Sequence, residues 1–278
     1  MYEAIIIGGG PAGLQAALTL GRMHRRVVLL DSGEYRNATV EHAHNLLGND
    51  GVAPADLRRR GRAELAAYAT IEIRDAAVSS VAADVDGVRV DVDGEILRAD
   101  YLVLATGLDD ELPPIPGLAK HWGVRVANCP FCHGHEFAGR PVAVLNASPH
   151  AAKLRGMLEP VASEVLVLDP ARVVAVEDVE DGLRLVLDDS STLDVAGAFV
   201  GPVMRQRAPF AADLGLTFQE SGAVRVDPYG RTGLERVFAA GDMAHPDHFP
   251  GPMATLAAAI ASGQLAAVAI VQSLAAPH

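Results

Sequence analysis

The stretch Ile5-Ile6-Ile7-Gly8-Gly9-Gly10-Pro11-Ala12-Gly13 decides the fold. Three isoleucines predict a short buried strand, and the glycines after it fit the pattern G-x-G-x-x-G at the entrance to a helix over 14–24. A second strand is expected over 26–30 and ends at an acid, Asp31. A strand, a glycine-rich turn, a helix and an acid about twenty residues further on form the βαβ unit that binds dinucleotides.

Each part of this unit has a physical task. Gly8 makes the tight turn, Gly10 lets the backbone approach a pyrophosphate, and Gly13 lets the helix pack against the strand. The helix N-terminus offers N–H groups and a partial positive charge to the phosphates, and Asp31 can hold the ribose hydroxyls. The residues expected to contact the nucleotide here are Gly8, Gly10, Pro11, Ala12, Gly13, Asp31, Ser32 and Arg36.

Two later strand ends indicate that the nucleotide carries a flavin. The apolar run 101–107 closes on Ala105-Thr106-Gly107, an ending that recurs in flavoproteins with two dinucleotide-binding domains. Residues 232–242 form a second short strand that ends in Gly241-Asp242. The Asp242 carboxylate can bind ribityl hydroxyls. The next helix, expected to begin near Met253 and Ala254, can direct its positive end toward the flavin ring.

The middle of the chain predicts a second, reduced unit of the same kind. After a stiff proline-rich linker over 113–117, a strand over 142–145, a helix over 151–158 and a strand over 165–168 repeat the βαβ order. The loop 146–150, Asn-Ala-Ser-Pro-His, replaces the glycines, so that Cβ atoms stand where a pyrophosphate needs bare backbone. A hairpin over 173–187 follows at once, which leaves one crossover helix missing. We interpret this unit as a scaffold without nicotinamide binding. An unusual nicotinamide site is the alternative.

These patterns predict an α/β protein with two Rossmann-like domains, the second inserted into the first and reduced. Residues 1–112 and 231–278 would form the FAD-binding domain, and residues 118–230 a degenerate NAD(P)-type domain. Asn45, in a polar loop after the second strand, is a further expected cofactor contact. In a helix over 54–68, the run Arg58-Arg59-Arg60 is expected to face solvent.

The only two cysteines of the 278 residues are Cys129 and Cys132, in the stretch C-P-F-C-H-G-H. Such a pair can alternate between a disulfide and two thiols and so carries two electrons. Three other uses were weighed: attachment of a c-type haem, a zinc site with His133 or His135, and purely structural cysteines. Haem attachment requires export, and no second ligand pair for zinc is visible, so redox chemistry on a flavin is favoured. We expect no metal.

Bulk properties limit the partners and the compartment. With 23 Lys and Arg against 35 Asp and Glu, the formal charge is −12, which argues against nucleic acid and anionic membranes as partners. No signal peptide is visible at the N-terminus. The uncharged run from Met253 to the C-terminus is long enough to raise a transmembrane interpretation. Its alanines and the break Ser262-Gly263-Gln264 favour a buried helix instead, and we expect a cytoplasmic protein.

With these residues in hand, the chain resembles the low-molecular-weight thioredoxin reductases over nearly its whole length. The resemblance rests on the glycine-rich turn with Asp31, on Asn45, on 105–107, on the cysteine pair and on 232–242, in family order. It implies FAD, a homodimer, Cys132 as the sulfur beside the flavin and Cys129 as the sulfur that exchanges with substrate. His133 stands where the reductases carry an acidic proton donor and acceptor, and His135 is a possible helper.

The C-P-F-C-H-G form is similar to a branch that includes the dithiol oxidases of gliotoxin and holomycin biosynthesis. We therefore expect an FAD-dependent dithiol oxidase, independent of NAD(P)H, that forms a disulfide in a small-molecule, peptide or protein dithiol and passes the electrons to O2. A thioredoxin reductase driven by NADPH or ferredoxin is the first alternative. A flavin-holding redox sensor without turnover is the second.

Overall fold

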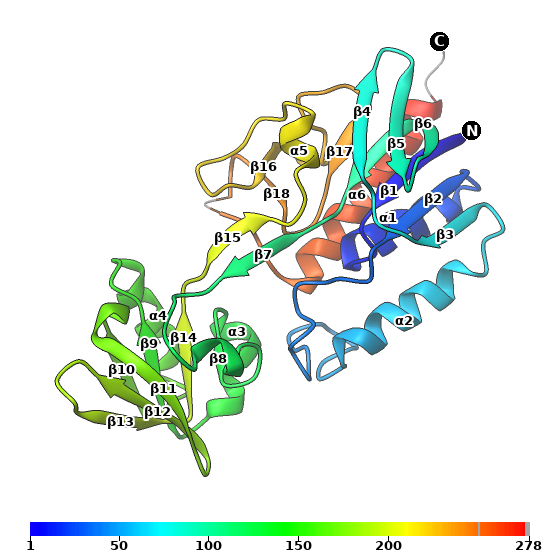
Figure 1. Ribbon diagram of the computed structural model, residues 1–278. Coiled ribbons are helices and arrows are strands. Elements are labelled where there is room, and N and C mark those ends of the chain that lie inside the picture. Colours follow the sequence, from blue (N-terminus) through cyan, green and yellow to red (C-terminus); the bar gives the residue numbers. More distant parts are fainter. Residues whose placement is uncertain (250, 276–278) are drawn as a thin grey trace. The chain divides into compact units, whose positions relative to one another are not determined.

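The glycine-rich turn lies at the centre of a seven-stranded sheet in the computed structural model, which describes residues 1–249 and 251–275 (Figure 1). Six strands follow the order β3-β2-β1-β6-β5-β4. The seventh, β17, pairs with residues 102–104 at the end of β6, on the side opposite β1. The parallel members are β1 (Tyr2–Ile7), β2 (Val27–Asp31), β3 (Ile71–Asp75), β6 (Glu95–Leu104) and β17 (Val237–Ala239). An antiparallel hairpin, β4 (Ser80–Asp84) and β5 (Gly87–Val92), completes the sheet. The run 101–107 belongs to the longer strand β6, which begins earlier, at Glu95, and ends at Leu104.

Two helices rich in small residues pack together on this sheet. Helix α1 (Pro11–Arg22) follows the turn directly, and α6 (Leu256–Ala275) lies against it (Figure 1). A Cβ at Gly263 would overlap the backbone of Ala12, so the break in the apolar run is the point of closest approach between the two helices. Among the described residues, α6 alone is long and apolar enough to cross a membrane. Its Ala266, Ala267 and Ile270 are completely buried in the core, but only 33% of its most apolar 18-residue window is buried, so the expected buried helix is buried on one face alone.

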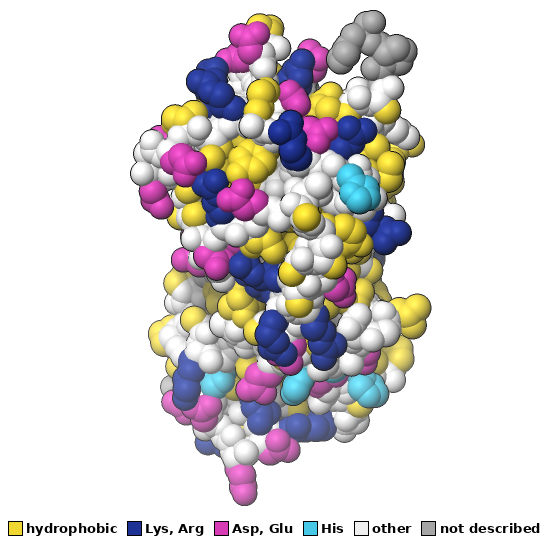
Figure 2. Space-filling model, turned by 90° about the vertical axis from the view of Figure 1, so that its right-hand side faces the viewer, with side chains coloured by type: hydrophobic (Ala, Val, Ile, Leu, Met, Phe, Trp, Pro, Cys, Tyr) yellow, Lys and Arg dark blue, Asp and Glu magenta, His cyan; other side chains and the backbone are white. Residues whose placement is uncertain are grey.

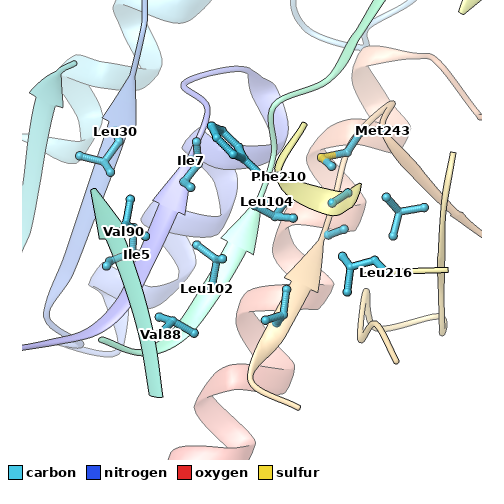
Figure 3. Close-up of a cluster of buried hydrophobic side chains, with 14 of the residues drawn as sticks. Ile5, Ile7, Leu30, Val88, Val90, Leu102, Leu104, Phe210, Leu216 and Met243 are labelled. Atoms are coloured by element: carbon cyan, nitrogen blue, oxygen red, sulfur yellow. The ribbon is translucent and has the colours of Figure 1, made fainter. Parts of the chain in front are cut away.

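The chain divides into two compact units, and the boundaries differ from the predicted ones. Unit 1 comprises 1–36, 55–109 and 204–278, and unit 2 comprises 37–54 and 110–203. The predicted second domain, 118–230, extends too far at its C-terminal end. Residues 204–230 contribute Phe210 and Leu216, from α5 (Phe210–Asp213) and the turn after it, to the same core cluster as Ile5 and Leu102 (Figure 3). The chain passes between the units along two paired strands, β7 (Leu108–Glu111) and β15 (Val203–Gln206).

Unit 1 also contains a smaller pair of parallel strands, β16 (Val224–Val226) and β18 (Ala244–Pro246), and the helix α2 (Pro54–Leu65) whose first residue lies at the boundary. Segment 37–54, expected in the first domain, belongs to unit 2. This reassignment matters for the site, because the segment carries Asn45 and three polar loop residues that are described below.

Unit 2 has a four-stranded parallel sheet in the order β10-β9-β14-β8. Its strands are β8 (Val126–Ala127), β9 (Pro141–Leu145), β10 (Glu164–Leu168) and β14 (Gly197–Val200). Helix α4 (His150–Leu158) connects β9 to β10. The connection from β10 to β14 consists of a short turn η3 (Pro170–Arg172) and an antiparallel sheet of β11 (Val173–Val179), β12 (Gly182–Leu187) and β13 (Thr192–Val195). The predicted lack of a crossover helix in this connection, which lies wholly within the described residues, is confirmed.

Candidate functional site

The turn after β1 in unit 1 has the shape that a pyrophosphate requires. Gly8 has φ +114°, and a Cβ there would overlap the carbonyl oxygen of Ala105. A Cβ at Gly13 would overlap the carbonyl oxygen of Gly8, so these two glycines permit the close packing of strand and helix. Gly10, in contrast, has nothing within 4 Å of its Cβ position. The open side of the turn therefore faces the space in front of the helix.

Helix α1 begins at this turn without a cap of its own. Gly10 is the N-cap residue and contributes no side-chain hydrogen bond, while Pro11 occupies the first helical position. The first-turn N–H groups of Ala12 and Gly13 are therefore not taken by a capping side chain. N–H groups at the start of a 12-residue helix suit an anionic ligand, so these residues fit the pyrophosphate of FAD.

The acid at the end of β2 is held by two arginines of α2. Asp31 is 2% exposed, and its Oδ2 accepts hydrogen bonds from Arg58 (2.9 Å) and Arg62 (2.8 Å). Its Oδ1 accepts the N–H of Gly33 at 3.0 Å. A carboxylate offers about four acceptor positions, so three of them are already used within unit 1. The expectation that Arg58 faces solvent is wrong: its guanidinium also donates to Gly9 O and lies 4.5 Å from the centre of the Tyr35 ring.

The two remaining strand ends lie at the same edge of the sheet. Because β6 and β17 are parallel neighbours with Leu104 opposite Ala239, the segments 105–107 and 240–242 leave the sheet side by side. The N–H of Ala240 donates to Leu104 O, and Thr106 Oγ1 lies 3.3 Å from the sulfur of Met243. Gly107 and Gly241 both have positive φ, 75° and 79°, where glycine is favoured.

Two predicted cofactor residues from distant parts of the sequence meet here. Arg36 Nη1 lies 2.9 Å from Asp242 Oδ2, and both side chains are mostly buried. Ser32 lies in the loop after β2 and accepts a hydrogen bond from Glu34 N. Helix α6 begins at Leu256, two residues later than expected. At the start of α6 the Thr255 hydroxyl accepts a hydrogen bond from the N–H of Ala258. Met253 and Ala254 lie in the loop before the helix.

The cysteine pair lies in unit 2 and forms a disulfide. Cys129 precedes a four-residue helix, α3 (Pro130–His133), and Cys132 lies inside it, with a Cα–Cα separation of 5.3 Å. Gly134 ends the helix, where a Cβ would be 2.5 Å from Pro130 O. Both sulfur-bearing residues are partly exposed, and Phe131 between them is 66% exposed. The described chain holds no free cysteine, so this pair carries all of its thiol chemistry.

His133 is fixed by a backbone carbonyl. Its Nε2 lies 3.2 Å from Gly123 O, and its Nδ1 is buried with no hydrogen-bond partner among the described residues. A nitrogen that faces a carbonyl carries the proton, which leaves the lone pair on Nδ1. Burial lowers the pKa of His133 below its usual value. The Gly123 carbonyl and Glu136 act in the opposite direction, and His44 lowers it further. The ring is therefore kept neutral near neutral pH.

Segment 37–54 brings further ionisable groups to the disulfide region, which the sequence analysis did not identify. His44 lies between two carboxylates, with Nδ1 3.6 Å from Asp50 and Nε2 3.4 Å from Glu136. Asn45 has φ +61°, and its N–H donates to Asp50. His135 is exposed at the start of η2 (His135–Phe137). No periodic pattern marks these contacts. The polar composition of the loop was the only available signal.

The loop that replaces the second glycine-rich turn uses its own N–H groups. The N–H of Ser148 donates to Asn146 Oδ1 at 2.7 Å, and the N–H of His150 donates to Ser148 Oγ at 3.2 Å. Ser148 O accepts the N–H of Ala151, and Pro149 has no N–H to offer. After β10, the Asp169 carboxylate accepts the N–H of Ala171. The donors that a nicotinamide pyrophosphate would need at α4 are thus engaged within the loop.

Charge is mixed over the surface, and no metal cluster is present in the described part of the chain. Figure 2 shows acidic and basic side chains interspersed on the face it presents. No group of three or more His, Cys, Asp and Glu among the described residues is placed to hold a metal ion. The zinc interpretation of the cysteine pair therefore gains no support.

The family model and the relatives named below are all disulphide oxidoreductases or thioredoxin reductases by name. The family model described as pyridine nucleotide-disulphide oxidoreductase matches residues 2–175 and 161–263. A "Probable thioredoxin reductase" of Arthroderma benhamiae is 35% identical over 64% of this chain but only 46% of its own length. "Thioredoxin reductase aclD" of Aspergillus oryzae is 33% identical over 99% of this chain and 97% of its own.

Solved structures agree with this result. An oxidoreductase from Agrobacterium tumefaciens is 31% identical, with a TM-score of 0.90 over 100% of this chain and 99% of its own. The crystal structure of HlmI is 32% identical, with a TM-score of 0.88 over 98% of this chain and 92% of its own. The architecture with two dinucleotide-binding domains that was predicted from the sequence is confirmed.

Proposed function

This chain belongs to the pyridine nucleotide-disulphide oxidoreductase family, as an FAD-dependent oxidoreductase of the thioredoxin reductase-like group, and we propose that within it the protein is a dithiol oxidase. Its substrate is a small-molecule, peptide or protein dithiol, and its electron acceptor is O2. The net reaction converts one dithiol and one O2 into one disulfide and one H2O2. It uses no NAD(P)H.

The state of the second phosphate loop carries this proposal. In place of bare backbone, the loop presents the side chains of Asn146 and Ser148, which accept the N–H groups that a pyrophosphate would require. Pro149 removes a further donor. The turn after β1 shows the opposite arrangement, with open space at Gly10 and an uncapped helix. The turn after β1 is open to a pyrophosphate, whereas the N–H groups of the loop 146–150 are bonded to that loop's own side chains. This contrast supports a protein that holds FAD and takes its electrons from thiols.

The disulfide gives each sulfur a part in the proposed reaction. A substrate thiolate attacks Cys129, the Cys129–Cys132 bond breaks, and Cys132 leaves as a thiolate. The second substrate thiolate then attacks the substrate sulfur of the mixed disulfide, so that the substrate disulfide leaves and both cysteines are reduced. One substrate proton passes to His133 and the other to a cysteine sulfur.

FAD, when bound, supplies the two-electron acceptor that reoxidises the cysteine pair and is itself reoxidised by O2. Unit 1 contributes the groups that would hold it. Gly8, Gly10, Pro11, Ala12 and Gly13 would bind the pyrophosphate, and Asp31, Ser32 and Arg36 the adenosine side. The flavin side is assigned to Ala105, Thr106, Gly107, Gly241, Asp242, Met253 and Ala254.

A thioredoxin reductase is the second candidate. Several relatives, such as the Aspergillus oryzae protein, are named thioredoxin reductases, which favours it. In that case the same cysteines would run in the opposite direction, with electrons from NADPH or ferredoxin. Reduction by ferredoxin would not require the missing phosphate loop.

Anaerobic reduction of the flavin separates the two candidates. The yellow holoprotein is mixed with dithiothreitol, NADPH, NADH or reduced ferredoxin, and its absorbance near 450 nm is followed. We expect the dithiol to bleach the flavin, and admission of air to restore it with one H2O2 per disulfide formed. Rapid bleaching by NADPH, or bleaching by ferredoxin but not by the dithiol, would overturn the proposal.

We also propose a cytoplasmic homodimer, by analogy with the group to which the chain belongs. The holoprotein should elute with the mass of two chains in light-scattering chromatography at micromolar concentration. A monomer at that concentration would contradict the assignment.

A further inference from the structure

Two arginines of α2 lie on the side of the helix that packs inside unit 1. The spacing i, i+3, i+4 and i+7 places four residues along this side, namely Arg58, Gly61, Arg62 and Leu65. Leu65 is buried, and a Cβ at Gly61 would lie 3.0 Å from the side chain of Leu14 on α1. Both guanidinium groups therefore reach the end of β2 from the packed side of α2.

Arg58 bonds two acceptors at once. Its Nη2 donates to Asp31 Oδ2 at 2.9 Å, and its Nη1 donates to the carbonyl oxygen of Gly9 at 2.6 Å. The two acceptors are neighbours, because a Cβ at Gly9 would lie 2.0 Å from Asp31 Oδ2. The planar fork of an arginine suits such a pair. Its Cζ lies 4.5 Å from the centre of the Tyr35 ring, and only 11% of the side chain is exposed, so the guanidinium is held in place.

Arg62 shares the acid with Arg58 but does not touch the turn. Its Nη1 donates to the same oxygen of Asp31 at 2.8 Å, and its Nη2 donates to the exposed Asp75 at 2.6 Å. Both of its hydrogen bonds in the described part of the chain thus go to carboxylates. The bond to the Gly9 carbonyl is what distinguishes Arg58 from Arg62.

The bond to the Gly9 carbonyl sets the direction of the next N–H. In a trans peptide the carbonyl oxygen and the following N–H point in opposite directions. With its oxygen turned toward Arg58, the peptide directs the N–H of Gly10 away from the guanidinium. That N–H has no hydrogen-bond partner among the described residues, and a Cβ at Gly10 would meet nothing within 4 Å. The Gly9–Gly10 peptide therefore offers its donor to a ligand in the turn.

We propose that Arg58 is a positioning residue of the FAD site, which fixes the Gly9–Gly10 peptide for the pyrophosphate and Asp31 for the adenosine side through one guanidinium. A peptide free to rotate would present its carbonyl oxygen to the phosphates part of the time. Holding it in one orientation removes this cost before FAD binds. Because a dithiol oxidase and a thioredoxin reductase both hold FAD, the inference is independent of the direction of electron flow.

Replacement of each arginine by methionine separates the two contacts. Arg58→Met and Arg62→Met each remove one donor from the same oxygen of Asp31, but only Arg58→Met releases the turn. The holoproteins are diluted to nanomolar concentration, and the dissociation constant for FAD is obtained from the flavin fluorescence that appears on release. It should rise by about tenfold or more for Arg58→Met and by less than about threefold for Arg62→Met. Equal rises, a larger rise for Arg62→Met, or no rise in either would overturn the inference.

Phosphorus NMR of the same variants, saturated with FAD, reports on the pyrophosphate itself. Arg58→Met should move at least one of the two phosphate signals away from its position in the original protein, because the donor at Gly10 is no longer fixed. Arg62→Met should leave both signals in place. If Arg58 acted only on stability, unfolding would become easier while both phosphate signals of the folded protein stayed unchanged, and that result would overturn the inference.

Arg58→Lys provides a second variant in case Arg58→Met does not fold. Lysine keeps the positive charge beside the buried Asp31, but all its donors are on one atom instead of on two arms of a fork. The variant should therefore fold, and its dissociation constant for FAD should still rise by about threefold or more. An affinity and phosphate signals equal to those of the original protein would show that charge beside Asp31 is sufficient, and the inference would be wrong.

Discussion

The Nε2 atom of His133 lies 3.2 Å from the carbonyl oxygen of Gly123. Since that carbonyl can only accept, Nε2 carries the hydrogen and Nδ1 the lone pair. Gly123 has φ +87°, and a Cβ there would lie 3.0 Å from the backbone of Thr39. A loop that is nearly a hundred residues away in sequence from the histidine thus packs against the residue whose carbonyl faces its Nε2.

The two cysteines should give different products when each is replaced by serine. Cys132→Ser leaves Cys129 free to form a mixed disulfide that no second cysteine resolves, while Cys129→Ser should form much less of it. Intact-mass spectrometry after addition of a disulfide of a monothiol, such as bis(2-hydroxyethyl) disulfide, measures the adduct, because this reagent carries no second thiol that could release the cysteine. Each adduct can be assigned to one sulfur, because the chain has no cysteine besides Cys129 and Cys132. Equal adducts in both variants would contradict the assignment of Cys129 to the substrate side.

Arg58 should matter for stability although it lies in a run of three arginines. Arg58→Met keeps much of the aliphatic packing but removes a charged donor from the buried Asp31, which should lower the free energy of unfolding by about 1–3 kcal/mol. Arg59→Met is the matched control. Arg59 is 69% exposed, pairs with Asp56, and should change stability by less than about 0.5 kcal/mol. Urea unfolding of both variants checks the difference, and equal losses would show that Arg58 is only a surface residue.

The close approach of α6 to α1 predicts that Gly263 tolerates no side chain. Gly263→Ala places a methyl group into the backbone of Ala12 and should cost about 1–3 kcal/mol. It should also weaken FAD retention, because Ala12 lies in the first turn of the phosphate-binding helix. Gly156→Ala in α4 meets nothing within 4 Å and should stabilise by up to about 1 kcal/mol. Thermal unfolding and the FAD content after gel filtration measure both effects. Unchanged values for Gly263→Ala would contradict the packing.

The features that could be predicted from the sequence are those formed by residues that are contiguous in it. The turn at Gly8–Gly13, the cysteine pair and the altered loop at 146–150 are each contiguous, and each has a local physical signature. What could not be predicted depends on contacts between distant segments. His44 meets Glu136 only because segment 37–54 joins unit 2, and no periodicity indicates this. The prediction for Arg58 was wrong because a run of charged residues normally faces solvent, whereas the Arg58 side chain reaches the buried Asp31.

Two histidines with a lowered pKa, His121 and His133, predict that the protein loses stability on acidification. Burial lowers the pKa of both His133 and His121, the latter being 8% exposed. In the unfolded chain both titrate near pH 6.5. As the pH falls below about 6.5, the unfolded state therefore binds protons that the folded state refuses, and the free energy of unfolding decreases until the folded pKa values are passed.

The slope of unfolding free energy against pH, from urea titrations of the holoprotein between pH 5 and 8, tests this. His133→Asn and His121→Asn should each make the slope shallower, by at most about 1.4 kcal/mol per pH unit. His150→Gln, exposed on α4, should leave it unchanged. A slope that persists in the His133→Asn/His121→Asn double variant would mean that other groups govern the acid sensitivity. The neutral state of His133 in the folded protein would then need a different explanation.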